Sequence, residues 1–234
     1  MKAIILAAGN GERLKPLSDT VPKCLLPIRG VPIINIWLRL CAANRITNVL
    51  VNTHAHANMV HRYIKAHCDG FRLRLSYEDR LLGSAGTLRA NRKWIGSDGD
   101  FWIFYGDVLT NVRLKEMLAF HRRQKVIATL GVCEVNNPAQ CGVVSIDDSS
   151  MVKEFAEKPA MPLGNLAFSG IKIGTPALLD EIPEQVPADL GFHVLPKLVG
   201  RMAAYRISEY LLDIGTPTTY QQAQLSWPGL DATA

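Results

Sequence analysis

Short apolar runs of strand length alternate with segments of helical period through the first half of this 234-residue chain. The period predicts strands at 3–7, 48–52, 71–77, 101–105 and 126–132, and helices at 32–43, 58–66, 85–94 and 114–123. Strands that alternate with helices in this way form a mainly parallel sheet, because each crossover helix packs back onto the sheet. The sequence therefore predicts an α/β fold with a doubly wound sheet that is flanked by helices.

The second half of the chain has a different pattern, in which short turns join the predicted strands. Strands are expected at 142–146, 151–155 and 167–173, and Asp147-Asp148-Ser149 is the turn between the first two. This spacing favours a small antiparallel excursion from the main sheet. Further along we expect a helix at 192–199, a strand at 204–207, a last helix at 217–225 and a frayed tail over 226–234.

Composition narrows the class of protein. A hydrophobic content of 48% with 20% charged residues is ordinary for a globular enzyme, and no apolar run is long enough for a membrane span. The first residues lead directly into a strand without a signal-peptide pattern, so we expect a cytoplasmic protein. The five cysteines are scattered and include no CxxC pair, which argues against a disulfide framework or a zinc site.

The net charge of +5 comes without a dense basic run and without interleaved aromatic residues. Nucleic-acid binding surfaces combine these two features, so we expect no nucleic-acid partner. A small substrate that is rich in phosphate explains a mild positive charge equally well.

A glycine loop at 8–11 directly follows the first predicted strand. Glycines leave backbone N–H groups open to close approach by phosphates. Prolines at positions 16, 22 and 27 should make the next segment a stiff, extended loop, and this loop carries Arg13 and Lys23. The pattern predicts a clamp for a nucleoside triphosphate.

Two known phosphate-binding motifs do not fit the glycine loop. It is not a Walker A motif, because no Gly-Lys-Ser/Thr follows at the required spacing. Leu14 stands where a dinucleotide-binding fingerprint needs its third glycine, and the second predicted strand ends in Asn52 rather than an acidic residue. A plain glycine turn before a basic surface loop stays open on the pattern alone.

Two aspartates lie beside the ends of predicted elements, one after a strand and one before a helix. Asp107 comes after the strand at 101–105 with one glycine between them, and Asp213 lies shortly before the helix that begins at Pro217. Ligands of an open α/β sheet bind beyond the carboxyl ends of its strands, where two carboxylates could hold Mg²⁺ with substrate phosphates. Each aspartate taken alone could equally be a helix cap or a turn residue.

Two other polar motifs have ordinary structural explanations. Glu157-Lys158 lies at the end of a predicted strand, where an exposed ion pair is the simplest interpretation. His54 and His56 have a metal-like spacing, but no acidic or thiol partner is near them in the sequence. We therefore expect these histidines to be structural.

Six segments of the chain form an ordered set of motifs: LAAGNGERLKPLSDTVPKCLLP (6–27), LGSAGTL (82–88), YGDV (105–108), CGVVSID (141–147), FAEKP (155–159) and LLDIGTP (211–217). Taken in order, they resemble the motifs of the sugar-1-phosphate nucleotidylyltransferases, the family that makes nucleotide sugars. The resemblance covers nearly the whole chain. It implies a Rossmann-like, GT-A-like fold in a single domain over 1–225, with a nucleotide-binding half at about 1–135 and a sugar-binding half at about 136–225.

The resemblance also implies a reaction. The phosphate oxygen of a sugar 1-phosphate attacks the α-phosphate of a nucleoside triphosphate in line, and pyrophosphate leaves. The sequence of these motifs is most similar to that of guanylyltransferases that act on mannose, heptose or cyclitol phosphates. The resemblance therefore favours GTP as the nucleotide. Uridylyl or cytidylyl transfer, to another sugar, an alditol or a cyclitol phosphate, stays open.

The family's residue roles carry over onto matching positions. Arg13 and Lys23 would be catalytic residues at the triphosphate, and Asp107 and Asp213 would hold Mg²⁺ as the cofactor. The implied nucleotide-binding residues are Leu6, Ala7, Ala8, Gly9, Asn10, Gly11, Glu12, Gly83, Ser84, Gly86 and Thr87. The implied sugar-phosphate-binding residues are Gly142, Glu157, Lys158, Asn165 and Ser169.

The chain departs from the family pattern at two places. Glu12 stands where many relatives have Thr, and Phe168-Ser169-Gly170 replaces the commoner Asn/Thr-Gly, so the role of Glu12 and the identity of the sugar stay open. Many relatives continue into a β-helix of hexapeptide repeats, which we do not expect here.

The expected partners are a nucleoside triphosphate and a sugar 1-phosphate, without nucleic acid or membrane, and homo-oligomerisation is left open. A catalytically inactive, nucleotide-sugar-binding regulatory subunit is the alternative from a different class. The presence of both basic residues together with both aspartates argues against that alternative.

Overall fold

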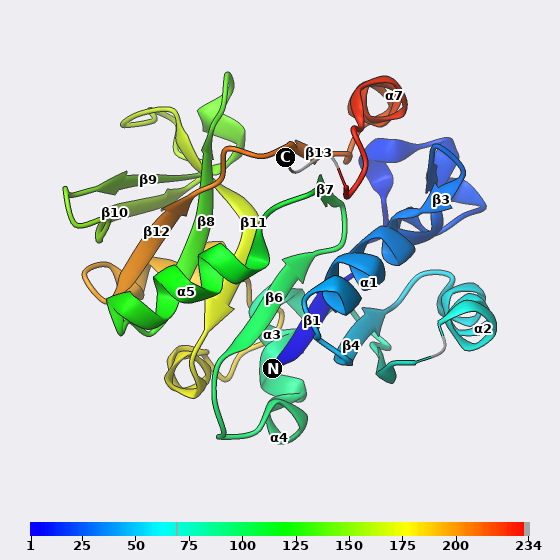
Figure 1. Ribbon diagram of the computed structural model, residues 1–234, viewed down its shortest axis with the longest axis horizontal. Helices are drawn as coiled ribbons and strands as arrows, with labels where there is room; N and C mark the ends of the chain where they lie inside the picture. The colour runs from blue at the N-terminus through cyan, green and yellow to red at the C-terminus, as the bar shows by residue number, and fades with distance from the viewer. Residues whose placement is uncertain (69, 232–234) are drawn as a thin grey trace. The chain divides into compact units, whose positions relative to one another are not determined.

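A computed structural model describes residues 1–68 and 70–231, and in it the chain forms two compact units (Figure 1). Unit 1 comprises residues 1–81, 104–113 and the segment from Glu209 onward, and unit 2 comprises 82–103 and 114–208. The sequence predicted two halves that meet once, at about residue 135. The two units differ from these halves, because the chain passes between the units four times. Strand β6 (Phe101–Tyr105) contributes residues to both units.

Unit 1 is built on parallel strands. Strand β1 (Lys2–Leu6) pairs with β4 (Asn48–Thr53), which pairs in turn with β5 (Arg72–Tyr77). The crossovers are helices α1 (Ile33–Ala43) and α2 (Ala57–His67), as parallel strands require. These strands and helices agree with the predicted ones to within two residues at each end.

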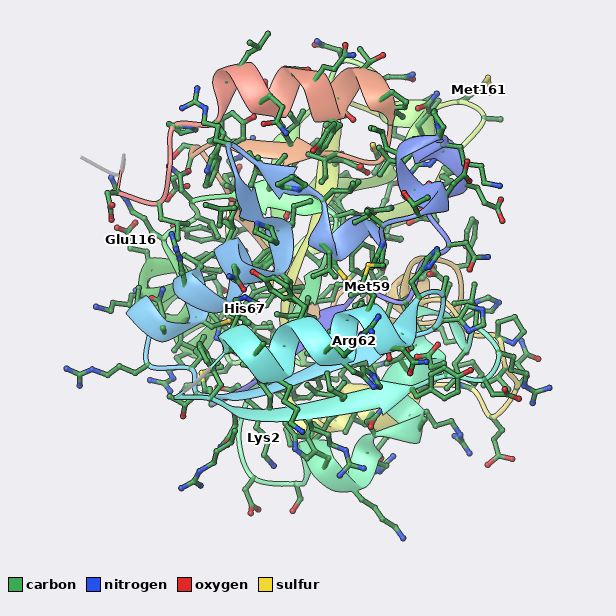
Figure 2. All side chains as sticks on the ribbon, turned by 90° about the vertical axis from the view of Figure 1, so that its right-hand side faces the viewer. Lys2, Met59, Arg62, His67, Glu116 and Met161 are labelled. Atoms are coloured by element: carbon green, nitrogen blue, oxygen red, sulfur yellow. The ribbon has the colours of Figure 1, made fainter. Side chains whose placement is uncertain are left out.

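The core of unit 1 lies between the strands and the apolar faces of these helices. Ile4 and Leu50 are fully buried, and the Trp37 ring of α1 stacks on Phe104 with 4.5 Å between ring centroids. The other side of α2 is polar: Arg62 and His67 are exposed, and Figure 2 shows both along this helix. Helix α2 is therefore amphipathic, as its period indicated.

Two short strand pairs and one helix complete unit 1. Strand β2 (Pro27–Ile28) pairs with β3 (Val31–Pro32), and β7 (Val108–Thr110) pairs with β13 (Leu211–Asp213). Helix α7 (Pro217–Ser226) begins with a capping box in which Thr216 and Thr219 bond reciprocally. It lies beside the β2–β3 hairpin, where Tyr220 and Gln224 donate to the carbonyl of Pro27 (Figure 1).

The segment after the glycine loop was expected to be extended and instead forms three turns of 3₁₀ helix. These are η1 (Glu12–Leu14), η2 (Leu17–Asp19) and η3 (Lys23–Leu25). The prolines do prevent an α-helix, but the fixed φ of proline suits the start of a short 3₁₀ turn as well as an extended loop. Buried Leu14 and Leu25 hold the turns against unit 1.

Unit 2 contains the antiparallel excursion. Strand β9 (Gly142–Ile146) pairs antiparallel with β10 (Val152–Glu157) and with β11 (Leu166–Gly174), which confirms the prediction. Strand β8 (Ala128–Glu134) pairs antiparallel with β11 and parallel with β12 (Met202–Arg206). Helix α5 (Leu114–Gln124) covers β8 and β12 (Figure 1).

Three segments differ from the sequence predictions. The helix expected at 85–94 is divided into α3 (Gly83–Ala90) and α4 (Arg92–Ile95), which meet at Asn91. The helix expected at 192–199 is a short α6 (Leu190–His193) followed by η6 (Leu195–Leu198), because Pro196 cannot continue an α-helix. Strand β12 begins two residues before the expected 204.

The tail that was expected to fray from residue 226 onward is ordered at its start. Ser226 is the last residue of α7, and Trp227 is 5% exposed, with its ring 5.3 Å from that of Tyr210. Burial of this aromatic ring keeps the chain against unit 1. Residues 232–234 of the predicted tail lie outside the described residues. No described helix combines the length and apolar character needed to span a membrane.

Candidate active site

The glycine loop has one closed and one open position. Gly11 has φ +71°, and a Cβ there would lie 2.8 Å from the Cβ of Ser18, so a side chain does not fit. The Ser18 hydroxyl donates to the Gly11 carbonyl at 2.7 Å and holds the turn. At Gly9, by contrast, a Cβ would meet no atom within 4 Å. The loop is therefore fixed at Gly11 and accessible at Gly9.

The base of the loop is held by a side-chain network that the sequence interpretation missed. The backbone N–H of Ala7 donates to Asn52 Oδ1 at 2.6 Å, and Asn52 Nδ2 donates to Glu78 Oε1 at 2.8 Å. Asn52 and Glu78 are buried, at 4% and 3% exposed. The available signal was a pair of polar residues, Asn52 and Glu78, near the ends of two neighbouring strands.

Lys23 and Asp107 meet in unit 1. The Lys23 ammonium lies 2.7 Å from Asp107 Oδ2, and both side chains are largely shielded from solvent, at 15% and 23% exposed. Asp213 lies near Asp107 as well, because Asp213 pairs with Val108, the residue that follows Asp107, in the β7–β13 ladder. The N–H of Ile214 donates to the Asp107 carbonyl at 3.0 Å. The two predicted metal ligands are therefore neighbours.

Asp213 retains contact with solvent, yet its surroundings raise the pKa of its carboxyl group. The main cause is loss of hydration, followed by the nearby Asp107 carboxylate. The N–H of Gly215, which donates to Asp213 Oδ1 at 2.6 Å, and the charges of Arg13 and Lys23 act in the opposite direction. Arg13, Lys23, Asp107 and Asp213 thus form one cluster of alternating charge.

Gly215 has no room for a side chain within this cluster. A Cβ would lie 2.6 Å from Asp213 Oδ1 and 2.7 Å from a guanidinium nitrogen of Arg13. We expect Gly215→Ala to displace both groups and to lower turnover by roughly tenfold or more, since small displacements of reacting groups are costly. Steady-state kinetics and thermal melting of the variant would check this.

Gly164→Ala is the matched control for Gly215→Ala, because a Cβ at Gly164 meets no atom within 4 Å. The control should keep both turnover and melting temperature. If Gly215→Ala were as active as the control, the close approach of Arg13 and Asp213 would have no role in the reaction.

The donor set at Asp107 and Asp213 fits Mg²⁺. Within the described residues no group of three or more His, Cys, Asp or Glu side chains could enclose a metal ion. Mg²⁺ does not require such a group, because proteins hold it through one or two carboxylates together with substrate phosphates and water. Asp107 and Asp213 would supply the protein's part of that coordination.

Unit 2 contains a second polar cluster, which is organised around Asp189 at the N-cap of α6. Asp189 Oδ1 accepts from the N–H groups of Gly191 and Phe192, at 2.7 Å and 3.2 Å. Its Oδ2 accepts from the Ser84 hydroxyl at 2.7 Å, and the Ser84 oxygen accepts from the N–H of Leu190 at 2.7 Å. Asp189 therefore joins the N-terminus of α3 to α6, and the sequence interpretation did not find it.

The other predicted nucleotide-binding residues of this segment pack within unit 2. Gly83 has φ +77° and lies against the backbone of Ala188, and Gly86 contacts the same residue through its N–H. The Thr87 hydroxyl donates to the Gly83 carbonyl at 3.1 Å. Their contact with a nucleotide stays a prediction. The other predicted nucleotide-binding residues, at 6–12, belong to unit 1. In that loop Ala8 is 6% exposed, and Asn10 and Glu12 are exposed.

Glu157 ends strand β10 and is half-buried. Two glycines make room for its carboxylate, since a Cβ at Gly142 would lie 2.7 Å from Glu157 Oε2 and one at Gly191 would overlap it. Burial raises the pKa of Glu157, and the Asp189 carboxylate raises it further. Lys158 and Lys172 lower it. Charges of both signs thus act on Glu157.

The remaining predicted sugar-site residues differ in accessibility. Lys158 is exposed and has φ +49°, with its N–H donating to the Cys141 carbonyl at 2.9 Å. Asn165 is exposed, and its carbonyl accepts from the N–H of Val135. Ser169 is 5% exposed, and its hydroxyl oxygen accepts from the N–H of Ile171. Ser169 is therefore a buried strand residue, whereas Lys158 and Asn165 are open to a ligand.

His54 and His56 lie outside both clusters. His54 Nδ1 donates to the Glu78 carbonyl at 2.8 Å, and His56 has a left-handed backbone at the start of α2. With His61 and Tyr77 they line an open recess of about 380 Å³.

Comparison with known proteins identifies the family. The family model described as "Nucleotidyl transferase" matches residues 2–227. The chain belongs to the nucleotidyl transferase family. This match extends over both units and all the segments named above. The glycine loop, the two aspartates and the Glu157-Lys158 pair are therefore parts of one family domain.

Individual members of the nucleotidyl transferase family are similar to most of the chain. "Mannose-1-phosphate guanylyltransferase catalytic subunit beta" of Xenopus tropicalis is 30% identical over 226 residues, which are 94% of this chain and 62% of the relative. "Mannose-1-phosphate guanylyltransferase 1" of Arabidopsis thaliana is 31% identical over 227 residues, 94% of this chain and 63% of the relative. The chain thus spans about 62% of the length of these relatives.

A crystal structure from Bacillus anthracis, described as a glucose-1-phosphate thymidylyltransferase in complex with sucrose, has a similar fold. The TM-score is 0.86 at 25% sequence identity, and the match covers 96% of this chain and 94% of that one. The predicted α/β class, a mainly parallel sheet flanked by helices with an antiparallel part, is confirmed.

Proposed function

We propose that this chain transfers a nucleoside monophosphate from a nucleoside triphosphate to a sugar 1-phosphate, with GTP and mannose 1-phosphate as the favoured pair. The observation that carries the proposal is the cluster in unit 1, in which Lys23 lies 2.7 Å from Asp107 and Asp213 is adjacent. The names of the relatives from Xenopus tropicalis and Arabidopsis thaliana support guanylyl transfer to mannose 1-phosphate.

The residues of unit 1 suit the handling of a triphosphate. The open backbone at Gly9 would donate N–H groups to phosphate oxygens, and Arg13 and Lys23 would neutralise charge as the α-phosphate is attacked. Asp107 and Asp213 would hold Mg²⁺, which offsets phosphate charge when it is bound. Little covalent chemistry falls to the protein, so positioning and charge neutralisation account for most of the catalysis.

The residues of unit 2 suit the handling of a sugar phosphate. Lys158 is an exposed cation beside the half-buried carboxylate of Glu157. An ammonium is a suitable point charge for a phosphate, and a carboxylate accepts hydrogen bonds from sugar hydroxyls.

A pyrophosphate-release screen tests the proposed reaction. GTP, CTP, UTP, ATP and dTTP are each offered with a panel of sugar 1-phosphates and Mg²⁺, and dTTP is included because of the Bacillus anthracis neighbour. We expect the highest rate with GTP and mannose 1-phosphate or a heptose phosphate. A Lys23→Ala protein serves as the background. Absence of turnover across the whole panel would favour the nucleotide-sugar-binding subunit, which calorimetry with nucleotide sugars would then test.

Lys158→Ala should separate the two substrates. Loss of this cation should raise KM for the sugar phosphate by about tenfold and leave KM for the nucleotide nearly unchanged, because a charge-assisted contact contributes about 1.5–3 kcal/mol. Titration calorimetry with each substrate would measure the difference. Equal weakening of both ligands would show that Lys158 does not act at a separate sugar-phosphate site.

Glu157→Gln should reduce discrimination between sugar epimers, because selectivity is greatest where a site is built to hydrogen-bond a hydroxyl group. The ratio of kcat/KM for two epimeric sugar 1-phosphates would measure this. An ordinary exposed ion pair between Glu157 and Lys158 predicts that neither substitution changes the kinetics.

A further inference from the structure

The positive charge of the chain is concentrated in one part of unit 1. Residues 20–77 contain eight Lys or Arg residues and one acidic residue, Asp69, which lies outside the described residues. Because the whole chain has a net charge of +5, the rest of it is slightly negative. Lys23 contacts Asp107, and Arg29 donates to α7. The other six cations are all exposed and form what we call the basic region: Arg39, Arg45, Arg62, Lys65, Arg72 and Arg74.

The basic region lies on α1, α2 and β5 and in the turn after α1. Helices α1 and α2 are neighbours, because Asn35 Nδ2 donates to the Tyr63 hydroxyl at 2.8 Å. Figure 2 shows unit 1 from the side of α2, with Arg62 labelled on that helix. None of the six cations forms an ion pair with another described residue. A patch of one sign without such partners attracts molecules of opposite charge.

Strand β5, which carries two of these cations, is an edge strand. Among the described strands it pairs with β4 alone, and the register of that pair is unbroken over all six residues of β5. Edge strands commonly avoid association through proline, a bulge or a very short length. Strand β5, with the sequence RLRLSY, has none of these devices. Only its charge restricts which partner could pair with it.

The backbone of β5 presents unpaired groups at this edge. The N–H of Arg72 donates to the Thr47 carbonyl and the N–H of Glu78 donates to the Thr53 carbonyl, each at 2.8 Å. The backbone groups of alternate residues of a strand point to the same side, so the even-numbered residues of β5 face β4. The N–H and C=O groups that point away from β4 belong to Leu73, Leu75 and Tyr77, and no described residue bonds to them.

The side chains of β5 alternate in character between the two faces of the strand. Arg72 and Arg74 share one face and are exposed. Leu73 and Leu75 are half-buried on the other face, together with the exposed Tyr77. A strand added beside β5 would place its own alternate side chains next to these two sets. Acidic residues complement the arginine face, and apolar residues complement the other.

We propose that the free edge of β5 binds an extended segment of another protein in which acidic and apolar residues alternate. The segment would join the sheet of unit 1 as an additional strand, held by the outward backbone groups of Leu73, Leu75 and Tyr77. Arg72 and Arg74 would select it by charge. A second copy of this chain does not fit, because pairing of β5 with β5 would bring arginines of the two copies together.

Peptide binding provides the first test. The probe is a fluorescent synthetic peptide of about eight residues in which Glu and Val alternate, and binding is followed by anisotropy at neutral pH. We expect it to bind at least tenfold more tightly than a peptide of alternating Lys and Val. It should also bind more tightly than a peptide with the same Glu and Val residues in two blocks, which cannot match both faces of β5. Equal binding of the block peptide, or no binding of the alternating one, would overturn the proposal.

Variants of β5 test the role of its charge. Arg72→Glu combined with Arg74→Glu should weaken binding of the Glu-Val peptide by about tenfold or more and strengthen binding of the Lys-Val peptide. Arg123→Glu makes the same kind of change at an exposed position of α5 and should leave both affinities as in the wild type. Circular dichroism checks folding, and Arg72→Gln with Arg74→Gln replaces the first pair if it does not fold. An effect of Arg123→Glu as large as that of the β5 variants would show attraction by net charge alone and overturn the proposal.

Hydrogen exchange followed by NMR tests whether a strand is added. In the free protein the amides of Leu73, Leu75 and Tyr77 should exchange quickly, while those of Arg72 and Arg74 are protected by β4. The Glu-Val peptide should slow exchange at the first three and change the other two little. Heparin, a polyanion without a peptide backbone, should not produce this alternating pattern. Peptide binding without the pattern, or the same pattern with heparin, would overturn the proposal.

Discussion

Asp107→Asn and Asp213→Asn should each lower turnover by orders of magnitude. Each substitution removes one of two adjacent carboxylates that are proposed to hold Mg²⁺, while the amide keeps the shape of the side chain. The β7–β13 ladder is made by backbone groups, so neither variant should unfold. Pyrophosphate release measured against Mg²⁺ concentration, together with circular dichroism, would check this expectation.

The Asp213 variant needs particular care, because loss of hydration and the nearby Asp107 carboxylate raise the pKa of the wild-type carboxyl group. Removing its charge relieves that repulsion, so Asp213→Asn should be at least as stable as the wild type. Asp148→Asn, in the exposed turn between β9 and β10, is the control and should keep full turnover. Full activity of either site variant in saturating Mg²⁺ would exclude that aspartate as a metal ligand.

Lys23→Ala should reduce the rate constant more than it reduces nucleotide affinity. Its ammonium is proposed to neutralise charge that grows at the α-phosphate, and loss of one such electrostatic donor costs on the order of 3 kcal/mol in the barrier. That is about a hundredfold in kcat. Single-turnover kinetics with GTP, together with equilibrium nucleotide binding, would separate the two effects.

The ion pair that Lys23 makes with Asp107 complicates the interpretation of its removal. The alanine variant leaves Asp107 beside Asp213 without that ammonium, so its dependence on Mg²⁺ should be measured as well. Lys15→Ala removes an exposed lysine of the same loop, paired with Asp19 at 3.6 Å, and should have little effect. Weakened nucleotide binding with unchanged turnover would make Lys23 a docking residue only.

The fold and the aspartate pair could be predicted from the sequence because each depends on a local pattern. Alternating apolar runs and helical periods predicted the parallel strands of unit 1 and the antiparallel ones of unit 2. Asp107 and Asp213 were expected together because each lies in a loop beside a strand or helix end. The short strands β7 and β13, which pair the two regions, were missed because three residues are too few to show a period.

The interior of the second cluster could not be predicted in the same way. Lys172 stands out in an apolar strand, but the carboxylates that act on it, Glu157 and Asp189, belong to other elements. In the sequence Asn52 shows only that the second strand lacks a final acidic residue, whereas in the structure it links Ala7 to Glu78. In each case the deciding partner lies far away in the sequence. A pattern read along the chain does not bring such residues together.

Each of the two units is made of segments that are separate in the sequence, and this limits how related proteins can exchange a whole unit by recombination. Unit 1 is assembled from three separate segments and unit 2 from two. A single crossover between two related genes, for example near codon 135, would therefore join parts of both units from different parents. A chimaera that inherits a whole unit 2 needs both 82–103 and 114–208 from one parent, with 104–113 from the other. Under the proposed function, in which unit 2 binds the sugar phosphate, a new sugar preference should therefore arise by point substitution more often than by exchange of a single block.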